Sequence, residues 1–214
     1  MVSGWKGGNL RERGTKVYLA GKVRHGDQNW REMLIASSGS QPVSTNMTWR
    51  QLANRSAPDV FKAISRIPLQ HSGFELSGPY IVGREQPSYT SNSEFGAEVF
   101  SAANSSGTID PETRDAARRV LLDLNTLLLE AADAVFVWLD AIDAFGTMAE
   151  IGQAYGRKPI FLAFFKKIPH EQLNELWYST HMADKVIFAD TPQQAFSEYV
   201  AWQKSHVSRV QAIT

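Results

Sequence analysis

Three short apolar runs in the second half of the chain constrain the fold most. Residues 134–139 (AVFVWL), 159–164 (PIFLAF) and 185–189 (KVIFA) are continuously apolar rather than alternating with polar residues. Such runs are typical of strands covered on both faces, as in a parallel sheet. The segments between them, 147–156 and 169–180, have the pattern of helices. This alternation predicts an α/β fold: a doubly wound, Rossmann- or flavodoxin-like parallel sheet with helices on both faces.

The remaining elements extend this pattern in both directions. Residues 16–20 (KVYLA) form the expected first strand, which ends at Gly21. A second strand is expected near 74–82, interrupted at Gly78-Pro79. Helices are expected over 30–35, 111–132 and 192–207, the long one opening with Asp-Pro-Glu, a helix-start signal.

The chain reads as one domain of 214 residues. We expect a flexible arm over about 1–14 and irregular insertions at about 36–72 and 84–110, because these segments lack sustained periodicity. No internal repeat is evident.

Composition excludes several classes of function. Lys plus Arg and Asp plus Glu each number 22, so no net charge attracts duplex nucleic acid or an anionic membrane. Without cysteine there is no disulfide and no thiolate nucleophile, and the five histidines show no i,i+4 pair for zinc. The polar N-terminal residues and the lack of a long apolar run indicate a cytoplasmic protein. A small-molecule partner is expected, without metal or cofactor.

Three acids gather where the third strand meets its helix. Asp140 and Asp143 follow the strand, and Glu150 lies in the next helix. In open parallel sheets ligands bind at the carboxyl ends of the strands, so this junction and the loop 21–26 can share one crevice. The simpler interpretation is structural, because Thr147 to Glu150 fits a capping box and the aspartates can be turn formers.

The functional interpretation is glycosidic chemistry. A glutamate in the first helical turn is kept ionised by backbone donors and the helix dipole, while a nearby aspartate offers a second carboxyl group. Retaining glycosidases use two such groups about 5 Å apart, one as the nucleophile and one to assist the leaving group. A nucleoside, whose leaving group is a base, would suit the same arrangement.

Two segments resemble the nucleoside 2-deoxyribosyltransferase family and its relatives, the nucleotide N-glycosidases. They are 16–26 (KVYLAGKVRHG) and 132–164, the latter with the pattern D-x-x-G-T-x-x-E-I-G. The resemblance implies that Glu150 is the nucleophile, that Tyr18 orients it and that Asp143, or else Asp140, assists recognition of the base. It also implies a homo-oligomer, since the family completes its pocket with residues of a neighbouring subunit.

The resemblance implies further contacts with the substrate. The first loop is similar to that of monophosphate-cleaving relatives, so Arg24 is expected to read a 5'-phosphate, with Lys22 and His25 as further candidates. The family often carries a helix aspartate at a position that is Asn125 here, and Asp123 lies two residues earlier. Asp143 is therefore the candidate for the leaving-group role and, with Glu150 and Tyr18, an expected catalytic residue. The substrate-binding residues implied are Gly21, Lys22, Arg24, His25, Asp123, Asn125, Asp140, Gly146 and Thr147.

Two other functions are compatible with the sequence. The same fold could cleave the nicotinamide glycosidic bond of NAD, or could be a nucleotide sensor in which Glu150 only caps its helix. Aromatic residues of the last two helices are candidates for a subunit contact, although each could equally be part of the core: Trp177, Tyr178, Tyr199 and Trp202.

Overall fold

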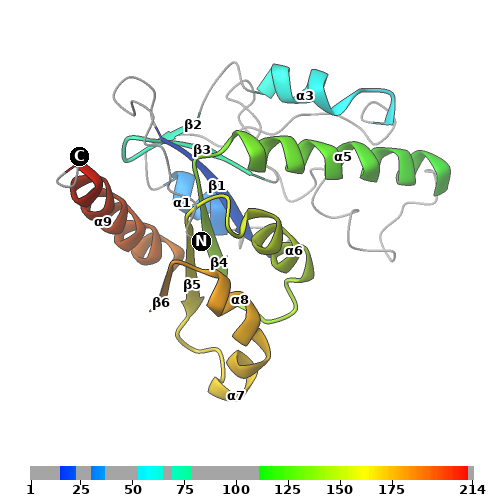
Figure 1. The fold of residues 1–214 in the computed structure, drawn as a ribbon. Coiled ribbons are helices and arrows are strands. Elements are labelled where there is room, and N and C mark those ends of the chain that lie inside the picture. Colours follow the sequence, from blue (N-terminus) through cyan, green and yellow to red (C-terminus); the bar gives the residue numbers. More distant parts are fainter. Residues whose placement is uncertain (1–14, 23–29, 37–52, 65–68, 79–110, 212–214) are drawn as a thin grey trace.

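The structure is a computed structural model that describes residues 15–22, 30–36, 53–64, 69–78 and 111–211. Within these residues the chain forms one sheet with helices on both faces (Figure 1). The expected arm at 1–14 and the expected insertion at 84–110 lie outside the described residues.

The sheet contains six strands within the described residues, in the order β2-β3-β1-β4-β5-β6. Neighbouring strands are parallel except for the β2–β3 pair, which is antiparallel. The five parallel strands therefore have the 2-1-3-4-5 order of a flavodoxin-like fold, which confirms the predicted fold class. The strands are β1 (Lys16–Gly21), β2 (Leu69–His71), β3 (Phe74–Ser77), β4 (Ala134–Leu139), β5 (Ile160–Phe165) and β6 (Lys185–Ala189).

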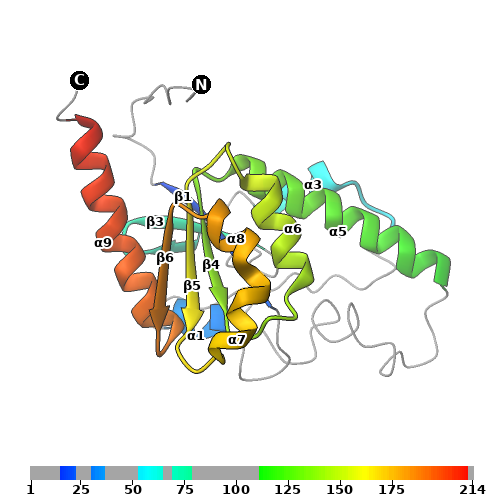
Figure 2. The ribbon, with the colours of Figure 1, turned by 60° about the horizontal axis from the view of Figure 1, so that its bottom comes forward.

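The helices divide between the two faces of the sheet. Figure 2 shows α9 on one side and α5, α6 and α8 on the other; α1 contacts α9, and α3 packs against α5. A short 3-10 turn, η1 (Asn174–Leu176), lies between α7 and α8. The helices are α1 (Trp30–Ala36), α3 (Ala57–Ile64), α5 (Pro111–Ala131), α6 (Phe145–Ala154), α7 (His170–Leu173), α8 (Trp177–Met182) and α9 (Pro192–Gln211).

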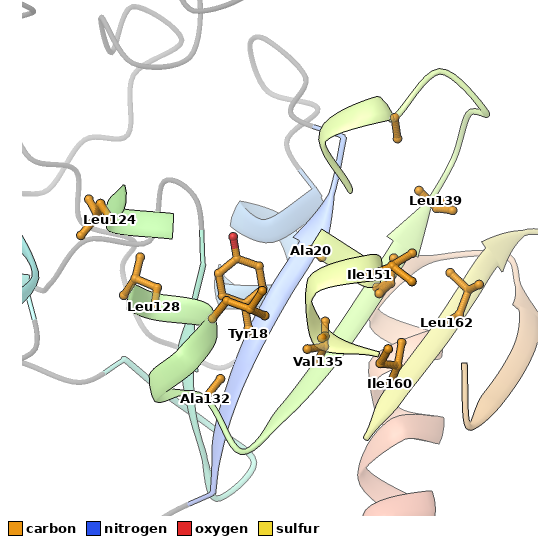
Figure 3. Close-up of a cluster of buried hydrophobic side chains, with 14 of the residues drawn as sticks. Tyr18, Ala20, Leu124, Leu128, Ala132, Val135, Leu139, Ile151, Ile160 and Leu162 are labelled. Atoms are coloured by element: carbon orange, nitrogen blue, oxygen red, sulfur yellow. The ribbon is translucent and has the colours of Figure 1, made fainter. Parts of the chain in front are cut away.

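The central strands bury both of their faces. On β4, Val135 and Val137 pack toward α5 and α6, whereas Phe136 and Trp138 pack toward α1 and α9. Figure 3 shows the first of these clusters, with Tyr18 among the leucines of α5. This double burial explains the continuous apolar runs of β4 and β5. It does not extend fully to β6, which is the edge strand and leaves Phe188 48% exposed.

Two aspartates fix the register at the amino ends of the strands. The backbone N–H of Lys16 donates to Asp133 Oδ2 at 2.8 Å, and the N–H of Asp133 donates to the carbonyl of Lys16 at 2.8 Å. Asp184 makes the same reciprocal pair with Ile160, at 2.8 and 2.9 Å. Each aspartate therefore links the start of one strand to that of its neighbour.

The structure departs from the expected elements in the segment 36–72. This segment contains α3 and β2, so it is not irregular throughout. β2 pairs with β3 through a tight turn at Ser72 and Gly73, where φ is 51° and 86°. The helix expected over 169–180 is broken into α7, η1 and α8. None of the helices in the described part of the chain is long and apolar enough to span a membrane.

Candidate functional site

The site lies at the point where the strand order reverses. β1 pairs with β3 on one side and with β4 on the other, so the chain leaves the carboxyl ends of β1 and β4 in different directions. Lys22, which follows β1, forms an ion pair with Asp143, which follows β4. The two connections therefore meet, as expected from the sequence.

A tyrosine and a glutamate meet beside this point. Tyr18 of β1 is fully buried, and its hydroxyl donates a hydrogen bond to Glu150 Oε1 at 2.6 Å. In Figure 3 the ring of Tyr18 lies next to Leu128 of α5. The contact expected from the resemblance is present.

Glu150 is not a helix cap. The helix α6 begins at Phe145, so Glu150 lies in its second turn, and the N-cap residue Ala144 makes no side-chain capping bond. Thr147, the other half of the expected capping box, is buried inside the helix, 4% exposed. The capping interpretation is therefore wrong, because the helix starts two residues earlier than its sequence pattern suggested.

The electrostatic surroundings also differ from the expectation. Burial raises the pKa of Glu150 above its ordinary value, and the hydrogen bond from Tyr18 and the positive charge of Arg31 oppose that rise. The predicted stabilisation of this carboxylate by the helix dipole is weak, because Glu150 lies beyond the first turn, where that effect fades. Burial raises the pKa of Tyr18 well above its ordinary value, and the nearby Glu150 raises it further, so Tyr18 remains a donor.

Arg31 was missed by the sequence analysis. It lies in α1, is 1% exposed, and its guanidinium donates to the carbonyls of Leu19 and Gly21. It also lies over the ring of Trp30, 4.5 Å from the centroid. No sequence pattern predicts it, because a buried arginine that binds backbone carbonyls needs no partner of a recognisable residue type.

Gly21 allows the close approach of three elements. Its φ is +155°, and a Cβ there would lie 2.5 Å from the carbonyl oxygen of Trp138 and 2.9 Å from the Trp30 ring. Only glycine fits, so the turn that leads to Lys22 depends on this residue.

The other predicted site residues differ in their exposure to solvent, and two of them lie outside the described residues. On α5 Asp123 is exposed, whereas Asn125 is partly buried. Gly146 is exposed and Asp140 is partly buried. Arg24 and His25 lie outside the described residues. Within the described ranges, no histidine, aspartate and glutamate side chains gather in a group that could hold a metal ion.

Fold and site together define an α/β protein with a Rossmann-like parallel sheet and a buried tyrosine–glutamate pair at its switch point. Comparison of the chain with protein-family models, with curated proteins and with solved structures finds no significant match.

Proposed function

We propose that the protein cleaves the N-glycosidic bond of a nucleoside, a deoxynucleoside or a nucleoside 5'-monophosphate through a glycosyl–Glu150 intermediate. The sugar then passes to water or to another base. The observation that carries the proposal is the 2.6 Å hydrogen bond from Tyr18, in the middle of β1, to Glu150 on α6. A carboxylate held by one oxygen and free of any capping role has the features of a positioned nucleophile.

The first chemical step would use the oxygen of Glu150 that Tyr18 does not hold. Oε2 attacks the anomeric carbon, and the bond from that carbon to the base nitrogen breaks with its electron pair going to the base. The departing base takes up a proton from solvent. Water, or an N–H nitrogen of a second base, then attacks the same carbon, loses a proton to solvent and releases Glu150 as a carboxylate.

Tyr18 would act on Glu150 rather than on the substrate. Its bond fixes the carboxylate against the buried face of β1, and it opposes the rise in pKa that burial causes. The nucleophile must be ionised to attack, so both effects favour the reaction.

Asp143 and Lys22 would recognise the substrate. Asp143 is 54% exposed and paired with Lys22, so its carboxylate can accept hydrogen bonds from a bound substrate. Lys22 is a partly exposed cation just after the end of β1, where an anionic group of the substrate could replace Asp143 as its partner.

The test is a screen for released base. Nucleosides, their 5'-monophosphates and NAD are incubated with the wild-type protein, and free base is measured by chromatography. We expect at least one nucleoside or monophosphate to be cleaved, and Glu150→Gln to lose nearly all of this activity while remaining folded. Glu175→Gln, an exposed glutamate in η1, is the matched control and should retain activity.

Three results would overturn the proposal. Turnover by Glu150→Gln above a few per cent of wild type would exclude Glu150 as the nucleophile. Cleavage of NAD alone would indicate the alternative substrate. Binding of a nucleotide without any cleavage would indicate a sensor.

A further inference from the structure

The two neighbours of β1 extend to different points along it. β4 pairs with β1 as far as Gly21, whereas the pairing with β3 reaches Tyr18 within the described residues. The carbonyl of Thr15 accepts a hydrogen bond from the N–H of Glu75 in β3. Because carbonyls alternate between the two sides of a strand, that of Leu19 points to the same side, beyond the last residue of β3.

Arg31 of α1 occupies the side of β1 that β3 leaves. The residue is 1% exposed. It donates from Nε and Nη2 to the carbonyl of Leu19, at 3.2 and 3.1 Å, and from Nη2 to the carbonyl of Gly21, at 2.8 Å. Its guanidinium therefore takes the place of a neighbouring strand along the last residues of β1.

The Nη2 atom of Arg31 bridges two carbonyls that a straight strand would hold further apart. The oxygens of Leu19 and Gly21 lie 3.1 and 2.8 Å from this atom, so their separation cannot exceed these two distances together. In a straight strand, carbonyl oxygens two residues apart are separated by about 6.6 Å, because each residue advances the chain by about 3.3 Å. The bridge therefore requires β1 to bend at its end, and Gly21 has the φ of +155° that only glycine adopts readily.

The bend sets the direction of Lys22, which follows Gly21 directly. Lys22 forms an ion pair with Asp143, which follows β4. The side chain of Lys22 is 34% exposed, so an anion can reach it from solvent. A phosphomonoester carries up to two negative charges near neutral pH, so it can compete with the carboxylate of Asp143 for the ammonium group.

We propose that Arg31 is a positioning residue for Lys22: by bridging the last carbonyls of β1, it directs Lys22 to bind a phosphate group of the substrate. The inference deepens the proposed function and rests on it for the activity measurement alone. The binding measurements below need no turnover.

The first test measures the binding of inorganic phosphate to Arg31→Lys. Lysine keeps the positive charge but lacks the two donor nitrogens of the guanidinium, so the geometry of the bridge changes and the charge does not. The Kd, followed by the NMR shift of the Gly21 amide, should rise about five- to tenfold. Arg118→Lys, the same substitution at an exposed position of α5, is the matched control and should bind phosphate as the wild type does.

A double-mutant cycle separates positioning from a general loss of structure. Lys22→Ala should weaken phosphate binding by about tenfold or more, and adding Arg31→Lys should have little further effect, because there is no ammonium group left to position. Equal factors in the two backgrounds would overturn the inference. So would wild-type affinity in Arg31→Lys, or no binding of phosphate by the wild-type protein.

A measurement on the wild-type protein applies even if Arg31→Lys does not fold. A guanidinium held by these hydrogen bonds rotates slowly, so the Nη1 and Nη2 atoms of Arg31 should give separate NMR signals. One averaged signal would show that the bridge is not held and would overturn the inference.

The activity measurement distinguishes this inference from the proposed function. Arg31→Lys should lower kcat/KM for a nucleoside 5'-monophosphate more than for the corresponding nucleoside, mainly through KM; equal losses would overturn the inference. If phosphate binding behaves as expected while no substrate is cleaved, the proposed function fails and the positioning role of Arg31 stands.

Discussion

At the scale of single residues, the bond between Tyr18 and Glu150 joins positions 132 residues apart. It links the middle of β1 to the second turn of α6, so the strand and the helix that define the candidate site are tied together by one contact. Any change to either side chain is therefore expected to affect the other.

Tyr18→Phe removes the hydroxyl group and keeps the ring, so it tests the hydrogen bond separately from the packing. The ring and its packing remain, so the protein should fold, but Glu150 loses a hydrogen bond that lowers its pKa. A bond to a charged group is worth about 1.5 to 3 kcal/mol, so kcat/KM should fall by about ten- to a hundredfold, most strongly at low pH. Rates across a pH series would check this, and an unchanged profile would show that Tyr18 only fills the core.

The raised pKa of Glu150 predicts a pH dependence of stability. The folded protein holds this proton more tightly than the unfolded chain does, whose pKa is near the ordinary 4.5. The stabilising contribution is therefore complete below pH 4.5 and is lost as the pH rises through the folded-state value. Relative to Glu150→Gln, the wild-type free energy of unfolding should decline across that window. Urea unfolding at several pH values measures it, and a constant difference would contradict the shift.

Part of this site can be predicted from the sequence. The order of strands and acids along the chain predicts that Glu150 and the loops after β1 and β4 share one region, and the family resemblance implies the role of Tyr18. The raised pKa of Glu150 was not predicted, because the burial of this side chain depends on where α6 begins relative to β1. Arg31 was missed because its partners are backbone carbonyls, which every residue carries.

At the scale of elements, the reciprocal bonds of Asp133 and Asp184 set the parallel register. Each aspartate precedes a strand and follows a small residue, Ala132 or Ala183. The bounds of β1, β4 and β6 were predicted closely, because their apolar runs begin after these aspartates or end at Gly21. Of the second strand, expected near 74–82, β3 covers Phe74–Ser77, and 79–82 lie outside the described residues. β2 was not predicted, since three residues give too short a pattern, and its turn residues Ser72-Gly73 were the available signal.

Asp133→Ala is expected to destabilise the fold. It leaves the N–H of Lys16 without its acceptor at a partly buried position, at a cost of about 1 to 3 kcal/mol. Asp133→Asn keeps an acceptor and should cost less. Asp123→Ala, at an exposed site on α5, should change the free energy of unfolding little. Urea unfolding of the three variants checks the predicted order of destabilisation. Equal losses in the free energy of unfolding at Asp133 and Asp123 would exclude a role of Asp133 in setting the strand register.

At the scale of the whole molecule, the aromatic residues of the last two helices fall into two groups. Tyr199 is buried and Trp202 packs beside it against Phe161, so these two belong to the core. Trp177 and Tyr178 are each 60% exposed and lie in contact on α8. The sequence could not separate these groups, because the burial of each aromatic side chain depends on how its helix packs against the sheet.

The expected homo-oligomer remains a prediction, and α8 is the element on which to test it. Light scattering should show a dimer or larger assembly at micromolar concentration. Replacing Trp177 and Tyr178 together by serine should shift it toward the monomer, because the exposed aromatic pair would supply apolar contact area. Phe188→Ser, at the exposed edge of β6, is the control. A wild-type monomer would exclude a site shared between subunits.

The central claim is that Glu150 becomes covalently attached to a sugar. The most direct measurement is mass spectrometry of the protein after acid quenching during turnover, or after reaction with a 2'-fluoro nucleoside whose intermediate hydrolyses slowly. The tryptic peptide 120–157 contains Asp140, Asp143 and Glu150, so fragmentation distinguishes them. The account predicts one glycosyl unit on Glu150 and none in Glu150→Gln. Base release without this adduct, or an adduct on another residue, would contradict it.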